Sequence, residues 1–154
     1  MIPTYTEQNT ISYSQHSDIS YYPSVCYDEN IMRKNILVVE DELDMQEALA
    51  GALIARDYTV QTADNGEEGL KLAIETEPDL IILDLLLPKM GGQEMLQKLR
   101  LHPKGKDVKV LMLTAMDDVE NIGRGYEKGI ADYIMKSNAS LSDIVAKVSI
   151  ELNV

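Results

Sequence analysis

The sequence contains no tryptophan, no phenylalanine and only one cysteine among its 154 residues. The lone cysteine, Cys26, cannot form a disulfide within the chain, so a disulfide-stapled extracellular scaffold is excluded. Histidine is also scarce, because only His16 and His102 occur, and neither has a second histidine or a cysteine at metal-binding spacing. The sequence therefore contains no zinc-binding motif.

Basic residues and long hydrophobic runs are also lacking. Lysine and arginine number 14 against 26 acidic residues, a net charge of −12, which would repel nucleic acid and anionic membranes. The longest apolar stretch, Leu80 to Leu87, is broken by Asp84 and is far shorter than the roughly 20 residues that span a bilayer. The amino terminus has neither the basic start nor the apolar core of a signal peptide. We therefore expect a cytoplasmic protein that binds neither nucleic acid nor membranes.

The first part of the chain differs in composition from the rest. Residues 1–33 are rich in serine, threonine and tyrosine and show no sustained apolar period, which predicts a poorly ordered extension. Residues 34–154 are then expected to form one domain. The tyrosines of the extension leave open a docking role, although a dispensable leader is the favoured interpretation.

The domain alternates short apolar runs with longer amphipathic stretches. Runs of strand length occur at Ile36–Val39, Tyr58–Thr62, Leu80–Leu83, Val108–Leu113 and Ala131–Met135. Helix-like stretches cover residues 43–56, 66–76, 92–101, 118–128 and 140–152. Helix-capping signatures pair Asn65 with Glu68, Asp117 with Glu120, and Ser140 with Asp143. Because almost wholly apolar strands must be covered on both faces, the pattern predicts an α/β fold, a doubly wound three-layer sandwich with a five-stranded parallel sheet.

Polar residues follow four of the five predicted strands. They are Glu40, Asp41 and Glu42 after the first, Asp84 at the end of the third, Thr114 at the end of the fourth, and Lys136 after the fifth. The carboxyl ends of parallel strands meet at one edge of a sheet, where such folds bind their ligands. Each residue alone has a structural interpretation, such as a helix start or a cap, but together they predict a site.

The chemistry of this set favours a metal ion and a phosphoryl group. Asp84 is flanked by apolar residues on both sides, and burying an unpaired carboxylate is costly unless a counter-ion is present. Together with Glu40 and Asp41 it suits Mg²⁺, which prefers oxygen ligands. Thr114 and Lys136 can donate hydrogen bonds to an oxyanion, a combination suited to phosphoryl transfer.

Residues 35 to the C-terminus resemble the response-regulator receiver family of two-component signalling. The resemblance rests on four stretches: Ile36-Leu-Val-Val-Glu-Asp-Glu, Leu83-Asp-Leu-Leu-Leu-Pro-Lys-Met-Gly-Gly, Met112-Leu-Thr-Ala and Gly125-Tyr-Glu-Lys-Gly-Ile-Ala-Asp-Tyr-Ile-Met-Lys. It implies a flavodoxin-like sheet of strand order 2-1-3-4-5. It also implies a phosphorylated signalling protein whose only reactions are self-phosphorylation from a phosphodonor and slow self-dephosphorylation, and which is otherwise not an enzyme.

The resemblance also implies a role for each site residue. Asp84 would be the phospho-acceptor, Asp41 a direct and Glu40 a water-mediated Mg²⁺ ligand, and the Leu86 carbonyl a further ligand. Thr114 would bind the phosphoryl oxygen, Lys136 would pair with it, and Tyr133 would be the aromatic switch that moves with Thr114. Leu86 and Met116 would flank the path of the attacking water. Because both are apolar, slow self-dephosphorylation is expected.

Partners follow from the same resemblance. A histidine kinase or phosphotransfer protein would supply the phosphoryl group, and the fourth helix, fifth strand and fifth helix would bind a downstream protein. The sequence ends with the fifth helix, so we expect a stand-alone regulator. The alternative is a phosphorylation-independent pseudo-receiver, whose usual mark is loss of the acceptor, metal or lysine position, and none is lost here.

Two other classes of protein, an aspartate-nucleophile hydrolase and a nucleotide binder, fit the sequence less well. A hydrolase with an aspartate nucleophile would have a second aspartate at position 86, where this sequence has leucine. A nucleotide binder would not have Glu40-Asp41-Glu42 in its phosphate loop, because these carboxylates would repel the phosphate.

Ser137 stands where the family has proline. A cis peptide bond before a residue other than proline would cost about 2.5–4 kcal/mol, so a trans bond is expected. A basic cluster is interpreted as a solvated loop rather than a docking patch: Lys98, Arg100, Lys104, Lys106 and Lys109.

Overall fold

The computed structural model describes residues 2–5, 11–14, 33–115 and 129–154 and divides the chain into two units, Met1–Ile31 and Met32–Val154. In the first unit, β1 (Ile2–Tyr5) pairs antiparallel with β2 (Ile11–Ser14). The sequence did not predict these strands, because four-residue strands leave too short a stretch to show a period of two. The poor order expected of residues 1–33 stays a prediction.

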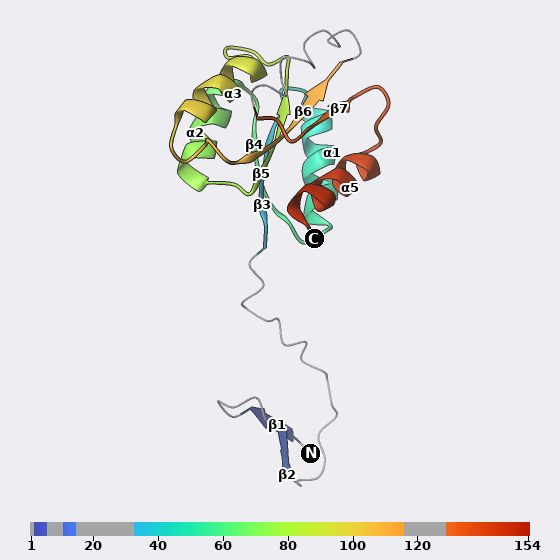
Figure 1. Cartoon of the computed structure of the whole chain (residues 1–154). Helices are drawn as coiled ribbons and strands as arrows, with labels where there is room; N and C mark the ends of the chain where they lie inside the picture. The colour runs from blue at the N-terminus through green and yellow to red at the C-terminus, as the bar shows by residue number, and fades with distance from the viewer. Residues whose placement is uncertain (1, 6–10, 15–32, 116–128) are drawn as a thin grey trace. The chain divides into compact units, whose positions relative to one another are not determined.

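The second unit contains a five-stranded, all-parallel sheet (Figure 1). Its strands are β3 (Asn35–Val39), β4 (Thr59–Ala63), β5 (Leu80–Asp84), β6 (Lys109–Thr114) and β7 (Asp132–Met135). They lie in the order β4-β3-β5-β6-β7. With β3 counted as the first strand of this unit, that order is 2-1-3-4-5, so the predicted flavodoxin-like topology is confirmed.

Helices cover both faces of the sheet (Figure 1). On one face lie α1 (Leu43–Ile54) and α5 (Leu141–Leu152), and on the other lie α2 (Gly66–Thr76) and α3 (Gly92–Leu101). The predicted helix 118–128 and its cap lie outside the described residues. None of the helices in the described ranges is long and apolar enough to cross a membrane.

The predicted caps of α2 and α5 are present. The Asn65 side chain accepts a hydrogen bond from the Glu68 backbone N–H at 3.0 Å. At the start of α5, Ser140 and Asp143 form a reciprocal capping box. Each cap satisfies amide donors that have no partner within the helix.

Alternation along the central strand β5 divides the core into two layers. Leu80 and Ile82 pack with residues of α1 and α5, whereas Ile81 and Leu83 pack with residues of α2 and α3. All five residues of β5 are buried. The strand therefore carries its last residue, Asp84, to the edge of the sheet with its carboxylate out of contact with most of the solvent.

The members of the predicted basic cluster all contact oxygen atoms of the chain itself. Lys98 pairs with Glu94, Lys104 with Glu77, Lys106 with Asp107, and Lys109 with the Glu151 carbonyl. Arg100 donates hydrogen bonds to the carbonyls of Gly105, Val108 and Gly129 at 2.6, 2.9 and 2.7 Å. The contacts of Arg100 and Lys104 tie the loop between α3 and β6 to its surroundings, whereas Lys98 pairs within α3 and Lys106 pairs with its neighbour in the loop.

Candidate functional site

Three carboxylates meet at the carboxyl edge of the sheet. Glu40 and Asp41 follow β3, and Asp84 ends the neighbouring strand β5. One oxygen from each of the three side chains lies within 4.8 Å of the other two. Glu40 is fully buried and Asp84 is 5% exposed, whereas Asp41 is exposed. The set predicted from the strand ends is thus brought together by the fold.

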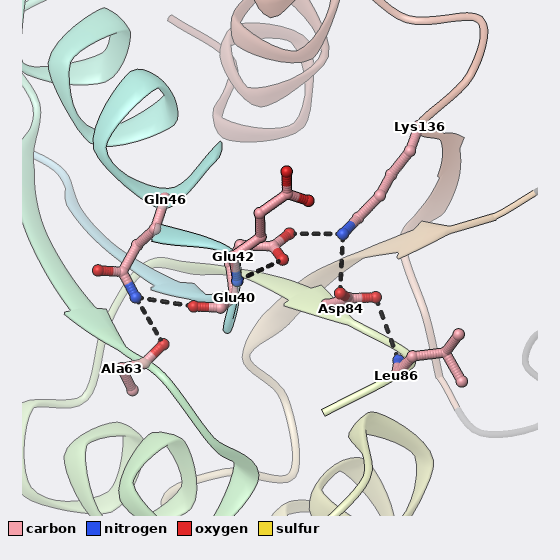
Figure 2. Close-up of polar contacts among 7 residues, drawn as sticks. All are labelled: Glu40, Glu42, Gln46, Ala63, Asp84, Leu86 and Lys136. Carbon is pink, nitrogen blue, oxygen red and sulfur yellow. Dashed lines mark hydrogen bonds and ion pairs between the residues drawn. The ribbon is translucent and has the colours of Figure 1, made fainter. Parts of the chain in front are cut away.

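Lys136 places its ammonium between two of these carboxylates, as Figure 2 shows. Its Nζ lies 2.7 Å from Glu40 Oε2 and 2.8 Å from Asp84 Oδ2. The residue follows β7 directly, and its backbone N–H donates to the Thr114 carbonyl at 2.9 Å. The described residues contain no cis peptide bond, so the expected trans bond between Lys136 and Ser137 is confirmed. Lys136 reaches both carboxylates with serine in place of the family's proline.

Backbone amides bind the remaining carboxylate oxygens. The Leu86 N–H donates to Asp84 Oδ1 at 3.1 Å, and the Glu42 N–H donates to Glu40 Oε1 at 3.2 Å (Figure 2). Glu40 Oε2 is buried and forms an ion pair with Lys136 Nζ at 2.7 Å. A carboxylate oxygen has more than one lone pair, so this oxygen can still bind a second cation.

Burial and charge shift the protonation equilibria in opposite directions. Burial raises the pKa of the Glu40 carboxyl above its usual range and the Asp84 charge adds to the shift, while Lys136 opposes both. Burial alone would lower the pKa of Lys136, but its contacts with Asp84 and Glu40 outweigh this and raise it. A nearby positive charge therefore stabilises the ionised forms of Glu40 and Asp84.

The residues present fit a magnesium ion. All three side chains offer hard oxygen donors, and two of the three residues, Glu40 and Asp84, are buried. Mg²⁺ is typically held by one or two carboxylates and several waters, so three converging carboxylates suffice. Glu40, Asp41 and Asp84 would hold the ion. The Leu86 carbonyl as a further ligand stays a prediction.

A close backbone approach fixes the loop after Asp84. The Gly92 N–H donates to the Leu85 carbonyl at 3.0 Å, and a Cβ at Gly92 would lie 2.0 Å from the Asp84 carbonyl oxygen. No side chain fits there. Gly92 therefore allows α3 to begin directly against the strand that carries Asp84.

The other predicted site residues are placed as follows. Thr114 is buried at the end of β6, and its hydroxyl donates to the Ala115 carbonyl at 3.0 Å. Tyr133 on β7 is half-buried and packs against the core layer beneath α2 and α3. Met116 lies outside the described residues. The switch and dephosphorylation roles of Thr114, Tyr133, Leu86 and Met116 stay predictions.

One residue near the site was not predicted from the sequence. Gln46 is 9% exposed, and its side-chain amide donates to the carbonyls of Glu40 and Ala63 at 2.8 and 3.0 Å (Figure 2). A signal exists in the sequence, because Gln46 shares the buried stripe of α1 with Leu49 and Leu53. A polar residue at an apolar position of a helix indicates a specific partner.

Replacing Lys136 by methionine is expected to destabilise the metal-free protein by about 2 kcal/mol at pH 7, because two buried carboxylates lose their counter-ion. The deficit should shrink above about pH 10.5: the pKa of Lys136 is raised in the folded protein, so its contribution is fully present below the unfolded pKa and is lost as pH rises through the folded pKa. Chemical denaturation in chelator at several pH values measures both effects.

The matched control is Lys34→Met. Lys34 pairs with Asp79 at 2.9 Å, but its side chain is 42% exposed against 24% for Lys136, so its loss should cost about 0–1 kcal/mol. Equal losses in the two variants would show that the buried carboxylates do not depend on Lys136.

Comparison with known proteins gives a consistent assignment. A family model for the response regulator receiver domain matches residues 36–149. The regulatory protein SilR of Salmonella typhimurium, described as a probable transcriptional regulator, is 39% identical over 113 residues, which is 73% of this chain and 48% of that protein. The transcriptional regulator RpaA of Synechocystis is 38% identical over 66% of this chain and 42% of its own length. The chain thus spans about half or less of the length of these relatives.

Solved structures agree. A receiver domain from a histidine kinase of Syntrophus aciditrophicus is 31% identical with a TM-score of 0.70, covering 78% of this chain and 90% of that one. The chemotaxis response regulator CheY4 of Vibrio cholerae is 25% identical with a TM-score of 0.72, covering 77% of this chain and 98% of that one. The fold, the converging carboxylates with their lysine, and these matches together show that the chain belongs to the response regulator receiver domain family.

Proposed function

We propose that this receiver domain accepts a phosphoryl group on Asp84, with Mg²⁺ bound by Glu40, Asp41 and Asp84. Receiver domains are signalling modules that take phosphoryl groups from histidine kinases, so a phosphohistidine-bearing kinase or phosphotransfer protein is the proposed donor. The observation that carries the proposal is the buried Asp84 carboxylate, which ends β5 between two further carboxylates and a lysine.

The chain's own residues divide the work of the transfer. An Asp84 oxygen would attack phosphorus, forming an acyl phosphate as the bond from phosphorus to the donor nitrogen breaks. When bound, Mg²⁺ would neutralise charge on the phosphoryl oxygens and the carboxylates. Lys136 already lies 2.8 Å from Asp84 Oδ2, so its ammonium would be available to a phosphoryl oxygen. The Thr114 hydroxyl would have to leave the Ala115 carbonyl to do the same.

We propose that the surface formed by β7 and α5 binds a protein. On α5, the exposed residues Ser142, Ala146 and Ile150 lie four residues apart and form an uncharged stripe beside the exposed Asp143; Ile150 is 71% exposed. The net charge of −12 supports protein rather than nucleic-acid contacts for this domain. We therefore propose that phosphorylation alters protein binding at β7 and α5, together with the predicted helix 118–128.

Incubation with acetyl phosphate and Mg²⁺ tests the proposal. Intact-mass measurement is expected to show one added phosphoryl group, and chelation of Mg²⁺ before the reaction should prevent the addition. Failure to gain mass while the protein binds Mg²⁺ normally would contradict the proposed function and favour the pseudo-receiver alternative.

Asp41→Ala is expected to abolish Mg²⁺ binding and phosphorylation yet raise stability in metal-free buffer by about 0.5–1 kcal/mol. The reason is that removing one of three crowded carboxylates relieves repulsion that Lys136 only partly offsets. The cap of α1 is Glu42, so the substitution removes no cap. Thermal melts with chelator and with Mg²⁺ measure the effect; a lower melting temperature without metal would contradict it.

A further inference from the structure

Gln46 joins three elements of the fold at the site. It lies in the first turn of α1, and its Nε2 donates to the carbonyl of Glu40, which follows β3, and to the carbonyl of Ala63, which ends β4 (Figure 2). Both acceptors are buried, as is Gln46 itself. One amide group therefore fixes the first turn of α1 against the ends of two strands.

These two carbonyls mark the place where the ladder between β3 and β4 ends. Val39 and Ala63 are the last pair in register, and the Glu40 N–H still donates to the Ala63 carbonyl at 3.0 Å. Beyond this point the chain leaves the sheet, so the Glu40 carbonyl can no longer be bound by a neighbouring strand. Gln46 supplies the donor that the ladder does not.

The segment between β3 and α1, whose Glu40 carbonyl Gln46 binds, carries two of the three proposed metal ligands. Glu40 and Asp41 directly precede the start of α1, and their positions relative to Asp84 depend on how this turn is held. Magnesium requires near-ideal octahedral geometry and does not tolerate displaced ligands well. Residues that hold ligands through hydrogen bonds typically change metal affinity 10–100-fold when they are replaced.

We propose that Gln46 is a positioning residue of the magnesium site, acting through the Glu40 carbonyl. The inference rests on the proposed function, because it requires Mg²⁺ to bind at Glu40, Asp41 and Asp84. Replacing Gln46 removes none of the three carboxylates. It removes the hydrogen bond that holds the segment between β3 and α1, which carries Glu40 and Asp41. The Kd for Mg²⁺ should rise about tenfold.

The test compares Gln46→Met with Ser149→Ala. Methionine keeps the length and flexibility of glutamine but donates no hydrogen bond. Ser149 bonds the hydroxyl of Tyr58 at 3.0 Å, beside the opposite end of β4, so its truncation removes a part-buried hydrogen bond far from the carboxylates. Both variants should lose stability in metal-free buffer. By calorimetric titration with Mg²⁺ at a temperature where both are folded, only Gln46→Met should show the tenfold weaker binding.

Gln46→Asn is the second variant, in case methionine prevents folding. Its amide is one methylene shorter and cannot reach both carbonyls, so the same weakening of Mg²⁺ binding is expected. Wild-type affinity in the Gln46 variants, or equal weakening in Ser149→Ala, would overturn the inference alone. Absence of Mg²⁺ binding by the wild-type protein would overturn the proposed function and the inference with it, which is a distinguishable result.

Discussion

Asp84→Asn is expected to gain no phosphoryl group from acetyl phosphate under conditions in which the wild-type protein gains one. The amide nearly matches the carboxylate in shape, but it is not a nucleophile and cannot form an acyl phosphate. The substitution also removes one negative charge from the cluster, so the variant should fold normally. Intact-mass measurement after a fixed incubation reports the difference directly.

Asp79→Asn is the matched control for this substitution. Asp79 directly precedes β5, the strand that Asp84 ends. It also pairs with a lysine, with Lys34 Nζ at 2.9 Å against 2.8 Å for Lys136 and Asp84. This variant should be phosphorylated like the wild type. Phosphorylation of Asp84→Asn, or its loss in both variants, would contradict the assignment of Asp84.

The phosphorylated protein is expected to lose its phosphoryl group slowly, and Leu86→Asn combined with Met116→Glu should accelerate the loss about 10–100-fold. Hydrolysis needs a water aligned opposite the bond that breaks, and positioning of this kind changes rates by orders of magnitude. The Leu86 side chain is apolar and 66% exposed two residues beyond Asp84, while its backbone N–H binds the Asp84 carboxylate. Polar side chains at these positions could orient the water.

The decay is measured by intact mass after the phosphodonor is removed. Leu101→Asn is a suitable control, because Leu101 is also an exposed leucine, at 86%, but it lies at the end of α3 that is away from Asp84. It should decay at the wild-type rate. If the double variant decays no faster than Leu101→Asn, the apolar residues do not limit hydrolysis.

The domain's architecture could be predicted because its strands are unusually regular in sequence. Each of the five predicted strands agrees with the structure to within one residue at either end, and α2 and α3 agree at both ends. The end of α1 was predicted two residues late. The chain there turns through Asp57, which has a φ of 64°. Glycine is the usual residue in this left-handed conformation and would have marked the helix end in the sequence. Because an aspartate takes that place here, the signal is missing.

The carboxylates and the lysine could be predicted because their positions follow from strand ends alone. The sequence could not predict that Lys136 pairs with both Glu40 and Asp84. That pairing depends on how far the Lys136 side chain extends from the end of β7 toward the ends of β5 and β3. Gln46 was missed for a related reason. Its partners are backbone carbonyls on two strands, and backbone acceptors carry no residue-type signal.

The most direct test of the central claim is to locate the phosphoryl group on the wild-type chain. Borohydride reduces an acyl phosphate on aspartate to homoserine, which is stable to proteolysis and identifiable by peptide mass spectrometry. After treatment with acetyl phosphate and Mg²⁺, reduction should convert position 84 and leave Glu40 and Asp41 unchanged. Conversion of Asp41 or another carboxylate instead, or a gain of mass with position 84 intact, would contradict the account.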